Sequence, residues 1–154
     1  MIVVEKSKRL LTLYDASGNA VHTFSVSLGK SPVGAKKREG DNKTPEGEYR
    51  ICTVNRESKF HLAFGLNYPN TFDALSALRE KRISPVSAFM IVLLNLFRLR
   101  PSWKTPLGGY IMLHGESPEG LTGDWTAGCI AMKNSDIDLL AGHIGKGEKV
   151  KISE

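Results

Sequence analysis

The amino-acid sequence predicts a mainly β fold, interrupted by a helical hairpin, in a single domain over residues 1–154. Three observations support this fold class. Residues 23–28 alternate between polar and apolar side chains, which is the period of a half-buried strand. Clusters of turn-forming residues separate short β-favouring runs in the first third of the chain. In the middle, Ser84-Pro85 precedes an apolar run, and a capping side chain followed by proline signals a helix start.

The composition is that of a folded domain with a moderately basic surface. The 154 residues, 41% of them hydrophobic and 24% charged, suffice for one core but not comfortably for two. The net charge of +5 suits a substrate that carries carboxylates. Because no basic helix or RNP-like aromatic stripe is present, nucleic acid is not an expected partner. The longest uncharged apolar run, residues 86–97, falls short of the ~20 residues of a transmembrane segment, so none is expected.

The first third is expected to hold strands around one long loop. β-Favouring runs near Val3 and over residues 11–14 precede the strand over 23–28. Residues 29–47 are rich in glycine and proline and predict a long loop, and such loops in compact domains are often functional. Residues 48–54 return to a strand.

The middle of the chain, about residues 69–101, is expected to form the helical hairpin. Residues 70–82 carry apolar side chains at helical spacing. The helix that starts at Ser84-Pro85 is apolar nearly all round, which is typical of a helix buried on several sides, and Pro101 would end it. Its role stays open: the hairpin either completes the core, covers a groove as a lid, or contacts a membrane or a partner.

The last third combines short strands with one helix. A strand over residues 110–113 is expected to end at His114-Gly115. Further on, Asn134 or Ser135 would cap a short helix with an acidic first turn. Residues 148–152 alternate and predict a final strand.

His114 and Cys129 are the candidate catalytic pair. A cysteine becomes a nucleophile when a neighbouring base or positive charge favours the thiolate. A strand that ends at His114 and a loop that returns 15 residues later could bring the two side chains together. Gly128 permits close backbone approach, so the N–H groups around Gly128 and Cys129 are natural oxyanion donors. A backbone carbonyl near Gly115 is the expected acceptor that orients the imidazole.

Both residues also have simpler explanations. A lone cysteine is usually a small buried hydrophobe, which is the expectation for Cys52 in a strand. A lone histidine is usually a surface residue or a satisfied core residue. The other histidines and Cys52 show no metal-ligand spacing, so no metal or other cofactor is expected.

Several motifs, taken in their order, resemble those of the YkuD-type L,D-transpeptidases. His114-Gly115 followed by residues 124–132 (DWTAGCIAM) resembles the active-site signature of this family, a His-Gly and then a Ser/Thr-x-Gly-Cys. Residues 28–49 resemble its "LG…GD…TPEG.Y" segment. Residues 64–70 and 105–109 resemble a subgroup that includes the ErfK/YafK-like members.

The resemblance implies a β-sandwich with a short helix after a catalytic cysteine, and acyl transfer on peptidoglycan stem peptides. Its nucleophile falls on Cys129 and its general base and acid on His114. The backbone carbonyl that orients the histidine falls on Gly115, and Gly128 is among the oxyanion donors. The implied location is the periplasm or cell envelope, although the opening residues Met1–Lys6 predict a strand and no signal peptide.

Three further residues are candidates for substrate binding. Tyr68 and Trp125 suit stacking against a sugar or peptide, although core packing suits them as well, and Thr126 adjoins the nucleophile turn. Two positions depart from the family. Ala127 stands where many members carry His, and Ala131 where many carry Arg or Asn, which bears on the choice of donor and acceptor.

Three functions follow from these residues. The first is L,D-transpeptidation, with a thioacyl-enzyme at Cys129, release of D-alanine and transfer to an amine. The second uses water as acceptor and makes the protein an amidase or L,D-carboxypeptidase on the same peptides. The third is a non-catalytic cell-wall-binding module, in which Cys129 would be unreactive. The sequence specifies neither the acyl acceptor, nor the stem-peptide chemistry, nor the oligomeric state.

Overall fold

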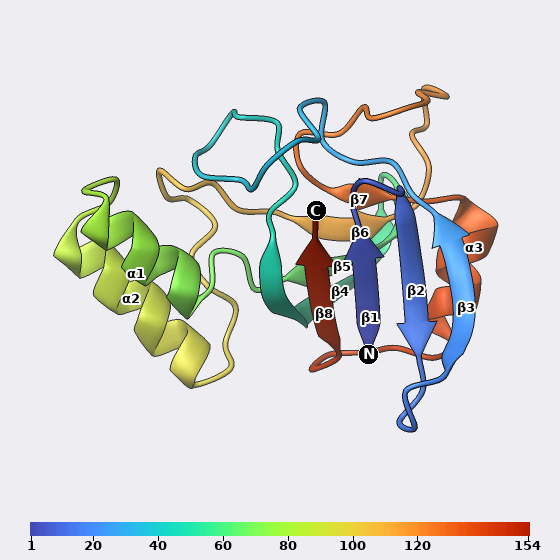
Figure 1. Ribbon diagram of the computed structural model, residues 1–154, viewed down its shortest axis with the longest axis horizontal. Coiled ribbons are helices and arrows are strands. Elements are labelled where there is room, and N and C mark those ends of the chain that lie inside the picture. Colours follow the sequence, from blue (N-terminus) through green and yellow to red (C-terminus); the bar gives the residue numbers. More distant parts are fainter.

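Eight strands form one curled sheet in the order β3-β2-β1-β8-β4-β5-β6-β7, in a computed structural model that describes all 154 residues (Figure 1). The strands are β1 (Ile2–Glu5), β2 (Leu10–Tyr14), β3 (Ala20–Ser25), β4 (Gly47–Ser58), β5 (His61–Leu66), β6 (Met112–His114), β7 (Ile130–Ala131) and β8 (Lys149–Ser153). The helices are α1 (Thr71–Arg79), α2 (Pro85–Leu96) and α3 (Asn134–Ala141). None of these helices has the length and apolar character needed to cross a membrane.

The long strand β4 joins the two halves of the sheet. Its first half pairs with β8 and its second half with β5, with register shifts along the way, so the sheet bends there. The segment after β3 then bonds back to the other edge, because the backbones of Ser27 and Ala131 exchange hydrogen bonds of 2.8 and 2.9 Å. The sheet therefore curls around its own apolar face, and the prediction of a mainly β, sandwich-like fold is confirmed.

The main core lies inside this curl and contains 21 buried residues. Alternate side chains of the strands point into it, as Ile2 and Val4 do from β1 and Leu113 does from β6. His114, the next residue after Leu113, consequently points to the other face of β6. The core thus sets the orientation of the candidate catalytic histidine.

The sequence analysis did not predict two of the strands, β5 and β7. β5 is buried at five of its six positions, since it lies between β4 and β6, and so it lacks the alternation that marks a half-buried strand. β7 has only two residues, which is too short for any pattern. The expected strand over 110–113 lies at Met112–His114.

The predicted cap of α3 is wrong. Lys133 occupies the cap position and makes no side-chain hydrogen bond to the helix. The Asn134 side chain instead accepts a hydrogen bond of 2.9 Å from the Glu116 amide. Asn134 therefore secures the loop after the candidate catalytic histidine instead of the helix end.

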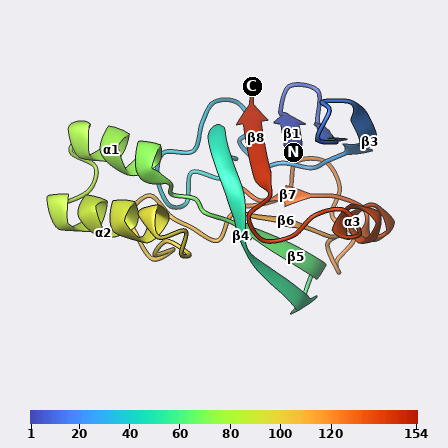
Figure 2. The ribbon, with the colours of Figure 1, turned by 90° about the horizontal axis from the view of Figure 1, so that it is seen from below.

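The helical hairpin forms, with the expected cap at Ser84, whose hydroxyl accepts from the Ser87 amide at 3.1 Å. It stands outside the sheet, beyond β4 and on the side opposite α3 (Figures 1 and 2). Of the roles left open for the hairpin, completion of the main core does not hold, because the hairpin packs around a separate cluster of six buried residues, three of them alanines. The expected burial of α2 on several sides is wrong too, since only Ala88, Ile91 and Asn95 are buried.

Candidate active site

His114 is the last residue of β6 and lies in an aromatic slot, with only 2% of its surface exposed. The ring of Phe60 stacks on the imidazole with 4.4 Å between ring centroids. The indole of Trp125 meets it edge-on at 5.5 Å. Phe60 comes from the turn between β4 and β5, and Trp125 from the loop before Cys129, so three segments of the chain fix the plane of the imidazole.

One hydrogen bond defines the imidazole tautomer. Nδ1 of His114 lies 2.8 Å from the carbonyl oxygen of Gly115, the acceptor that the sequence analysis expected. Because a carbonyl oxygen only accepts, Nδ1 carries the proton and Nε2 keeps its lone pair. Burial lowers the pKa of His114 and outweighs the opposite effect of this hydrogen bond. The ring is therefore neutral near pH 7 and offers Nε2 as a base.

Cys129 directly precedes β7, and the strand register places it on the same face as His114. Leu113 pairs with Ile130 in the parallel β6–β7 ladder, and both of these side chains enter the main core. Since side chains alternate along a strand, Cys129 and His114 both belong to the opposite face. The two are diagonal neighbours there, on strands spaced by about 5 Å. The strand register thus places the two residues that the sequence analysis singled out on one face of the sheet.

The Cys129 thiol is half-buried and neutral. Its Sγ donates to the carbonyl oxygen of Tyr110 at 3.2 Å. Burial raises the pKa of the thiol to about 11, and neither the Met112 amide nor the charge of Lys36 offsets this effect. With His114 neutral as well, the resting pair is a thiol beside an imidazole and not a preformed ion pair.

A tight backbone turn presents the thiol. The Thr126 hydroxyl donates to the Cys129 carbonyl at 2.7 Å and accepts from the Gly128 amide at 3.1 Å. Gly128 has a φ of +132°, and a Cβ there would lie 2.6 Å from the carbonyl oxygen of Lys43, so only glycine fits. The expected role of the Gly128 N–H as an oxyanion donor needs correction, because that N–H is occupied. The Cys129 amide has no hydrogen-bond partner and is the donor that remains.

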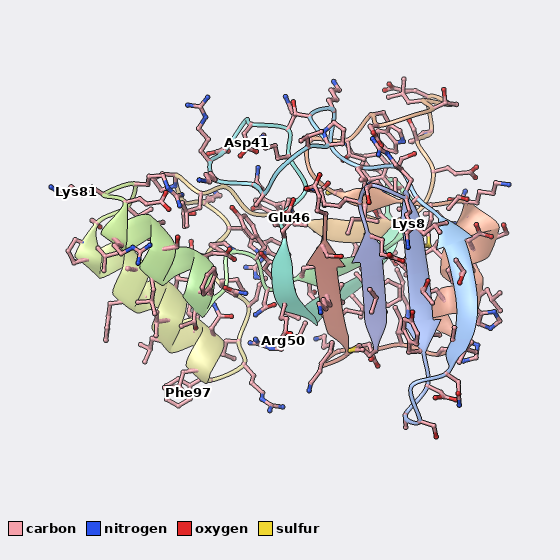
Figure 3. The ribbon with its side chains drawn as sticks, viewed as in Figure 1. Lys8, Asp41, Glu46, Arg50, Lys81 and Phe97 are labelled. Carbon is pink, nitrogen blue, oxygen red and sulfur yellow. The ribbon has the colours of Figure 1, made fainter.

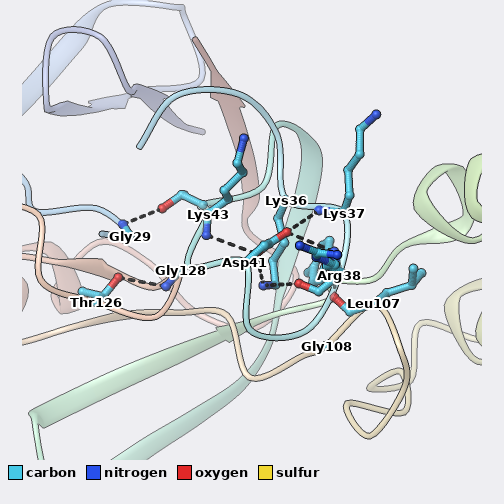
Figure 4. Close-up of polar contacts among 12 residues, drawn as sticks. Gly29, Lys36, Lys37, Arg38, Asp41, Lys43, Leu107, Gly108, Thr126 and Gly128 are labelled. Carbon is cyan, nitrogen blue, oxygen red and sulfur yellow. Dashed lines mark hydrogen bonds and ion pairs between the residues drawn. The ribbon is translucent and has the colours of Figure 1, made fainter. Parts of the chain in front are cut away.

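The loop between β3 and β4 packs against this turn (Figure 4). The Gly29 amide donates to the buried Thr44 hydroxyl at 3.0 Å, and Gly29 has no room for a side chain against the Gly128 backbone. Asp41 orders the loop, since its carboxylate accepts from Lys36 Nζ at 2.7 Å and from three backbone amides. Burial would raise the pKa of Asp41, but these bonds lower it overall, so the carboxylate stays ionised.

Asp124 ties the turn to the other half of the sheet. Its carboxylate accepts from the Leu28 amide at 3.0 Å and from the Arg9 guanidinium at 2.9 Å. The sequence analysis quoted both Asp41 and Asp124 within motifs but assigned neither a task. Their positions in the sequence could have indicated this role, because an acidic residue inside a glycine-rich loop commonly accepts several backbone hydrogen bonds.

The three candidate substrate-binding residues have different places. Tyr68 is 1% exposed in the main core, and its hydroxyl donates to the Leu107 carbonyl at 3.0 Å, so the expected contact with substrate is wrong for this residue. Thr126 is buried and is used up by the turn itself. Trp125 is half-buried against His114 and remains a candidate.

Two aromatic residues near the pair were missed by the sequence analysis. Phe60 stacks on His114, and Tyr110 places its carbonyl oxygen against the thiol. Tyr110 has a φ of +56°, an uncommon conformation for a bulky residue, and its exposed ring lies 4.7 Å from that of Trp103. No sequence pattern marks either residue, because both act through contacts made only in the folded chain.

A cavity of about 470 Å³ lies on the His114 side of the site. The loop after Gly115 and the start of β5 line it, with Lys59, Glu116 and Asn134 as its charged and amide side chains. Neither His114 nor Cys129 is among its lining residues.

Comparisons with known proteins match this chain over most of its length. The profile of the YkuD family, described as the L,D-transpeptidase catalytic domain, matches residues 1–152. YafK of Escherichia coli (strain K12), itself a provisional L,D-transpeptidase, is 24% identical over 142 residues. That alignment covers 89% of this chain and 44% of YafK.

Solved structures show the same likeness. The helical cell shape determining protein Pgp2 from Campylobacter jejuni superposes with a TM-score of 0.70 at 25% identity, over 99% of this chain and 46% of Pgp2. Bd1075 from Bdellovibrio bacteriovorus gives a TM-score of 0.64 at 27% identity, over 99% of this chain and 47% of Bd1075. The chain therefore spans about half the length of these relatives.

Proposed function

Because the chain belongs to the family of L,D-transpeptidase catalytic domains, we propose that it is a cysteine acyltransferase acting on peptidoglycan stem peptides. The observation that carries this proposal is the neutral His114 imidazole, whose free Nε2 belongs to the same sheet face as the Cys129 thiol. The net charge of +5 suits stem peptides, which carry carboxylates. The proposed location is the periplasm or cell envelope, where such peptides occur.

The first half-reaction forms a thioester. His114 Nε2 takes the thiol proton, and the Cys129 sulfur attacks the carbonyl carbon between the diamino acid at stem position three and the following D-alanine. The Cys129 amide donates to the oxyanion that develops on the carbonyl oxygen. The C–N bond then breaks, the imidazolium returns its proton to the leaving amine, and free D-alanine departs.

The second half-reaction transfers the acyl group to an amine. The amine of a second stem peptide, or of a protein lysine, loses a proton to His114 Nε2 as it attacks the thioester carbonyl. The new C–N bond forms while the C–S bond breaks, and the imidazolium reprotonates the sulfur. The pair returns to its neutral resting form, which agrees with the directions in which burial moves both pKa values.

An acylation experiment tests the nucleophile. A carbapenem-type probe should label the wild-type chain once, as measured by intact-protein mass spectrometry, and Cys129→Ala should abolish the label. Cys52→Ala is the matched control, because Cys52 is the other free thiol and should leave labelling unchanged. Full labelling of Cys129→Ala would remove Cys129 from the mechanism, and an unreactive wild type that still binds sacculi would favour a non-catalytic wall-binding module.

A product analysis tests the acceptor. Incubation with tetrapeptide muropeptides, followed by mass spectrometry, should show dimers together with free D-alanine. Shortened monomers without dimers would mean that water takes the acyl group, and the protein would then be an L,D-carboxypeptidase or amidase. Pgp2 is named as a determinant of cell shape. A role for this chain in cell shape is accordingly part of the proposal, and is consistent with either acceptor.

A further inference from the structure

The hairpin carries an apolar face that nothing in the structure covers. Helical geometry places Val86, Phe89, Met90 and Phe97 on the side of α2 opposite its buried residues and Leu96 at the edge of that side, and all five are exposed. Phe89 is 63% and Phe97 67% exposed, and Phe72 of α1, at 76%, lines a cavity together with Leu96. We refer to these six residues as the apolar face. Several large exposed apolar side chains on one helical hairpin mark a candidate site of interaction.

Basic residues frame the apolar face. Residues 81–115 contain no Asp or Glu, but they contain five Lys and Arg residues. Lys81 and Arg82 lie in the turn before α2, where Arg82 pairs with Glu80 at 2.8 Å, and Arg98 follows its last turn. The helix between these ends has no charged residue, so the apolar face is uninterrupted, and Lys81 and Arg98 are the unpaired charges next to it.

A basic cleft adjoins the apolar face. Two cavities of about 630 and 550 Å³ lie between the hairpin and the β4–β8 strands, and both are lined by Arg50 and Leu96. The guanidinium of Arg50 pairs with no carboxylate and makes only long 3.4 Å contacts to Asn95. Figure 3 places Arg50 on β4 beside the hairpin and Phe97 at the end of α2.

The charges of this cleft are mostly of one sign. Lys149 is directly opposite Arg50 in the β4–β8 register, and Lys149, Lys151 and Arg98 line the second cavity. Two carboxylates also line the cleft: Glu48, in both cavities and directly opposite Lys151 in the same register, and Glu46, in the first cavity and paired with Lys6 at 2.6 Å. Like charges opposite one another on a sheet are destabilising, so an anion bound here would relieve their repulsion.

We propose that the apolar face and the basic cleft form a docking surface for an anionic lipid bilayer. The α2 helix would lie along the bilayer surface, with Phe89, Leu96 and Phe97 among the upper acyl chains. Arg50, Arg98 and Lys149 would then meet lipid phosphates. A bilayer presents apolar chains next to a plane of negative charge, which is the combination that this surface complements. The inference does not depend on the proposed acyl transfer.

A second copy of the chain fits this surface less well. A two-fold dimer through the apolar face would bring the same patch of each subunit together. Because residues 81–115 contain no acidic residue, the basic ends of one α2 would then meet the basic ends of the other. Anionic lipid meets both the apolar and the charged part of the surface without that repulsion.

Vesicle sedimentation tests the proposal with the full chain. Wild type should bind vesicles that contain phosphatidylglycerol more tightly than vesicles of phosphatidylcholine alone, and added salt should weaken binding. Phe89→Ser/Phe97→Ser should weaken it by roughly tenfold or more, because two aromatic rings no longer enter the acyl region. Arg98→Glu/Lys149→Glu should do the same on phosphatidylglycerol only. Val33→Ser/Leu139→Ser, which removes two exposed apolar side chains elsewhere, is the matched control and should bind like wild type.

Each outcome decides the question. Circular dichroism and the Tm of every variant establish whether it is folded. The Phe89→Ser/Phe97→Ser and Arg98→Glu/Lys149→Glu variants alter different parts of the surface, so if one of them fails to fold, the other still tests the proposal. Wild-type binding that both variants retain would overturn the proposal, as would equal binding to neutral vesicles. A wild-type dimer in light scattering that Phe89→Ser/Phe97→Ser dissociates, without any vesicle binding, would show that a second copy occupies the face.

Discussion

The turn that carries Cys129 is densely packed, whereas the hairpin of α1 and α2 leaves much of its apolar surface exposed. At the turn, three backbone segments meet at Gly29, Lys43 and Gly128, with no space for another side chain. In the hairpin, a cluster of six buried residues holds two helices together, while larger apolar side chains face outward. The first arrangement holds the proposed nucleophile in place, and the second leaves a surface free for contact.

Polar groups differ between these two regions in the same way. The carboxylates around Cys129 have specific partners, Asp41 with four donors and Asp124 with two, and the Cys129 amide is left free at the turn. The outward side of α2 has no polar group to satisfy. Substitutions should therefore affect chemistry and stability at the turn, and mainly binding at the hairpin.

The largest effect is expected at His114. His114→Gln removes the proposed base but keeps a polar side chain, and should slow acylation by about 10²–10⁴-fold. The pH dependence of the acylation rate provides a second test. Burial lowers the pKa of His114 and raises that of Cys129 to about 11, so both groups stay neutral between about pH 7 and 9. The wild-type acylation rate should be flat over that range.

The acylation rate of His114→Gln should depend on pH, because without a base only the small fraction of Cys129 that is already ionised can attack. Its rate should rise about tenfold per pH unit over the same range. Stopped-flow acylation with a carbapenem measures both profiles. A flat profile for the variant would show that another base acts on the thiol.

A smaller but still severe effect is expected at Gly128. Gly128→Ala places a methyl group 2.6 Å from the Lys43 carbonyl oxygen, at a φ of +132°. Strained backbone and overpacking together should cost about 2 kcal/mol or more of unfolding free energy and slow acylation. Chemical denaturation measures the first and probe labelling the second. Gly145→Ala is the control, since a Cβ there meets nothing within 4 Å.

How far the sequence predicts each region follows from what holds the region together. The helix starts at Asn70 and Ser84 and the alternating strands are local patterns, so they can be predicted from neighbouring residues. β5 is set by its neighbours on both sides, and no local signal distinguishes it. The exposure of α2 could not be predicted either, because an all-round apolar helix is ordinarily buried.

The candidate site shows the same division. Cys129, His114 and the Gly115 carbonyl follow from the order of motifs and from the chemistry of those residue types. The stacking of Phe60 and the hydrogen bond to Tyr110 join residues far apart in the chain, and they follow only from the fold. Gly128 was named for the right reason, close backbone approach, but the Thr126 hydroxyl that occupies its amide is visible only in three dimensions.

In the hairpin, a buried and an exposed residue of the same helix, α2, can be compared. Ile91→Ala removes a buried side chain from the six-residue cluster and should destabilise the hairpin by about 2–4 kcal/mol. Phe89→Ala, two residues earlier and exposed, should change unfolding by no more than about 0.5 kcal/mol. Hydrogen exchange of the α2 amides distinguishes local from global unfolding. Equal costs for the two variants would mean that the outer side of α2 is covered.

The smallest effect is expected at Asp73, whose carboxylate accepts from the Asn70 amide at 2.8 Å in the capping box of α1. Burial raises the pKa of Asp73 to about 6, against opposing hydrogen bonds from Asn70 and Tyr49. A carboxyl whose folded-state pKa is raised stabilises the fold fully below its unfolded pKa of about 3.9, and that contribution is lost as pH rises through about 6. Asp73→Asn, which keeps an acceptor but does not titrate, should therefore raise the Tm at pH 7.5 and change it less at pH 4.5. The gain should be small, because Tyr49 and the Asn70 amide already stabilise the charged form. A larger gain in Tm at pH 4.5 than at pH 7.5 would contradict this prediction. It would show that the ionised carboxylate stabilises the hairpin, as the Asp41 and Asp124 carboxylates do around the Cys129 turn.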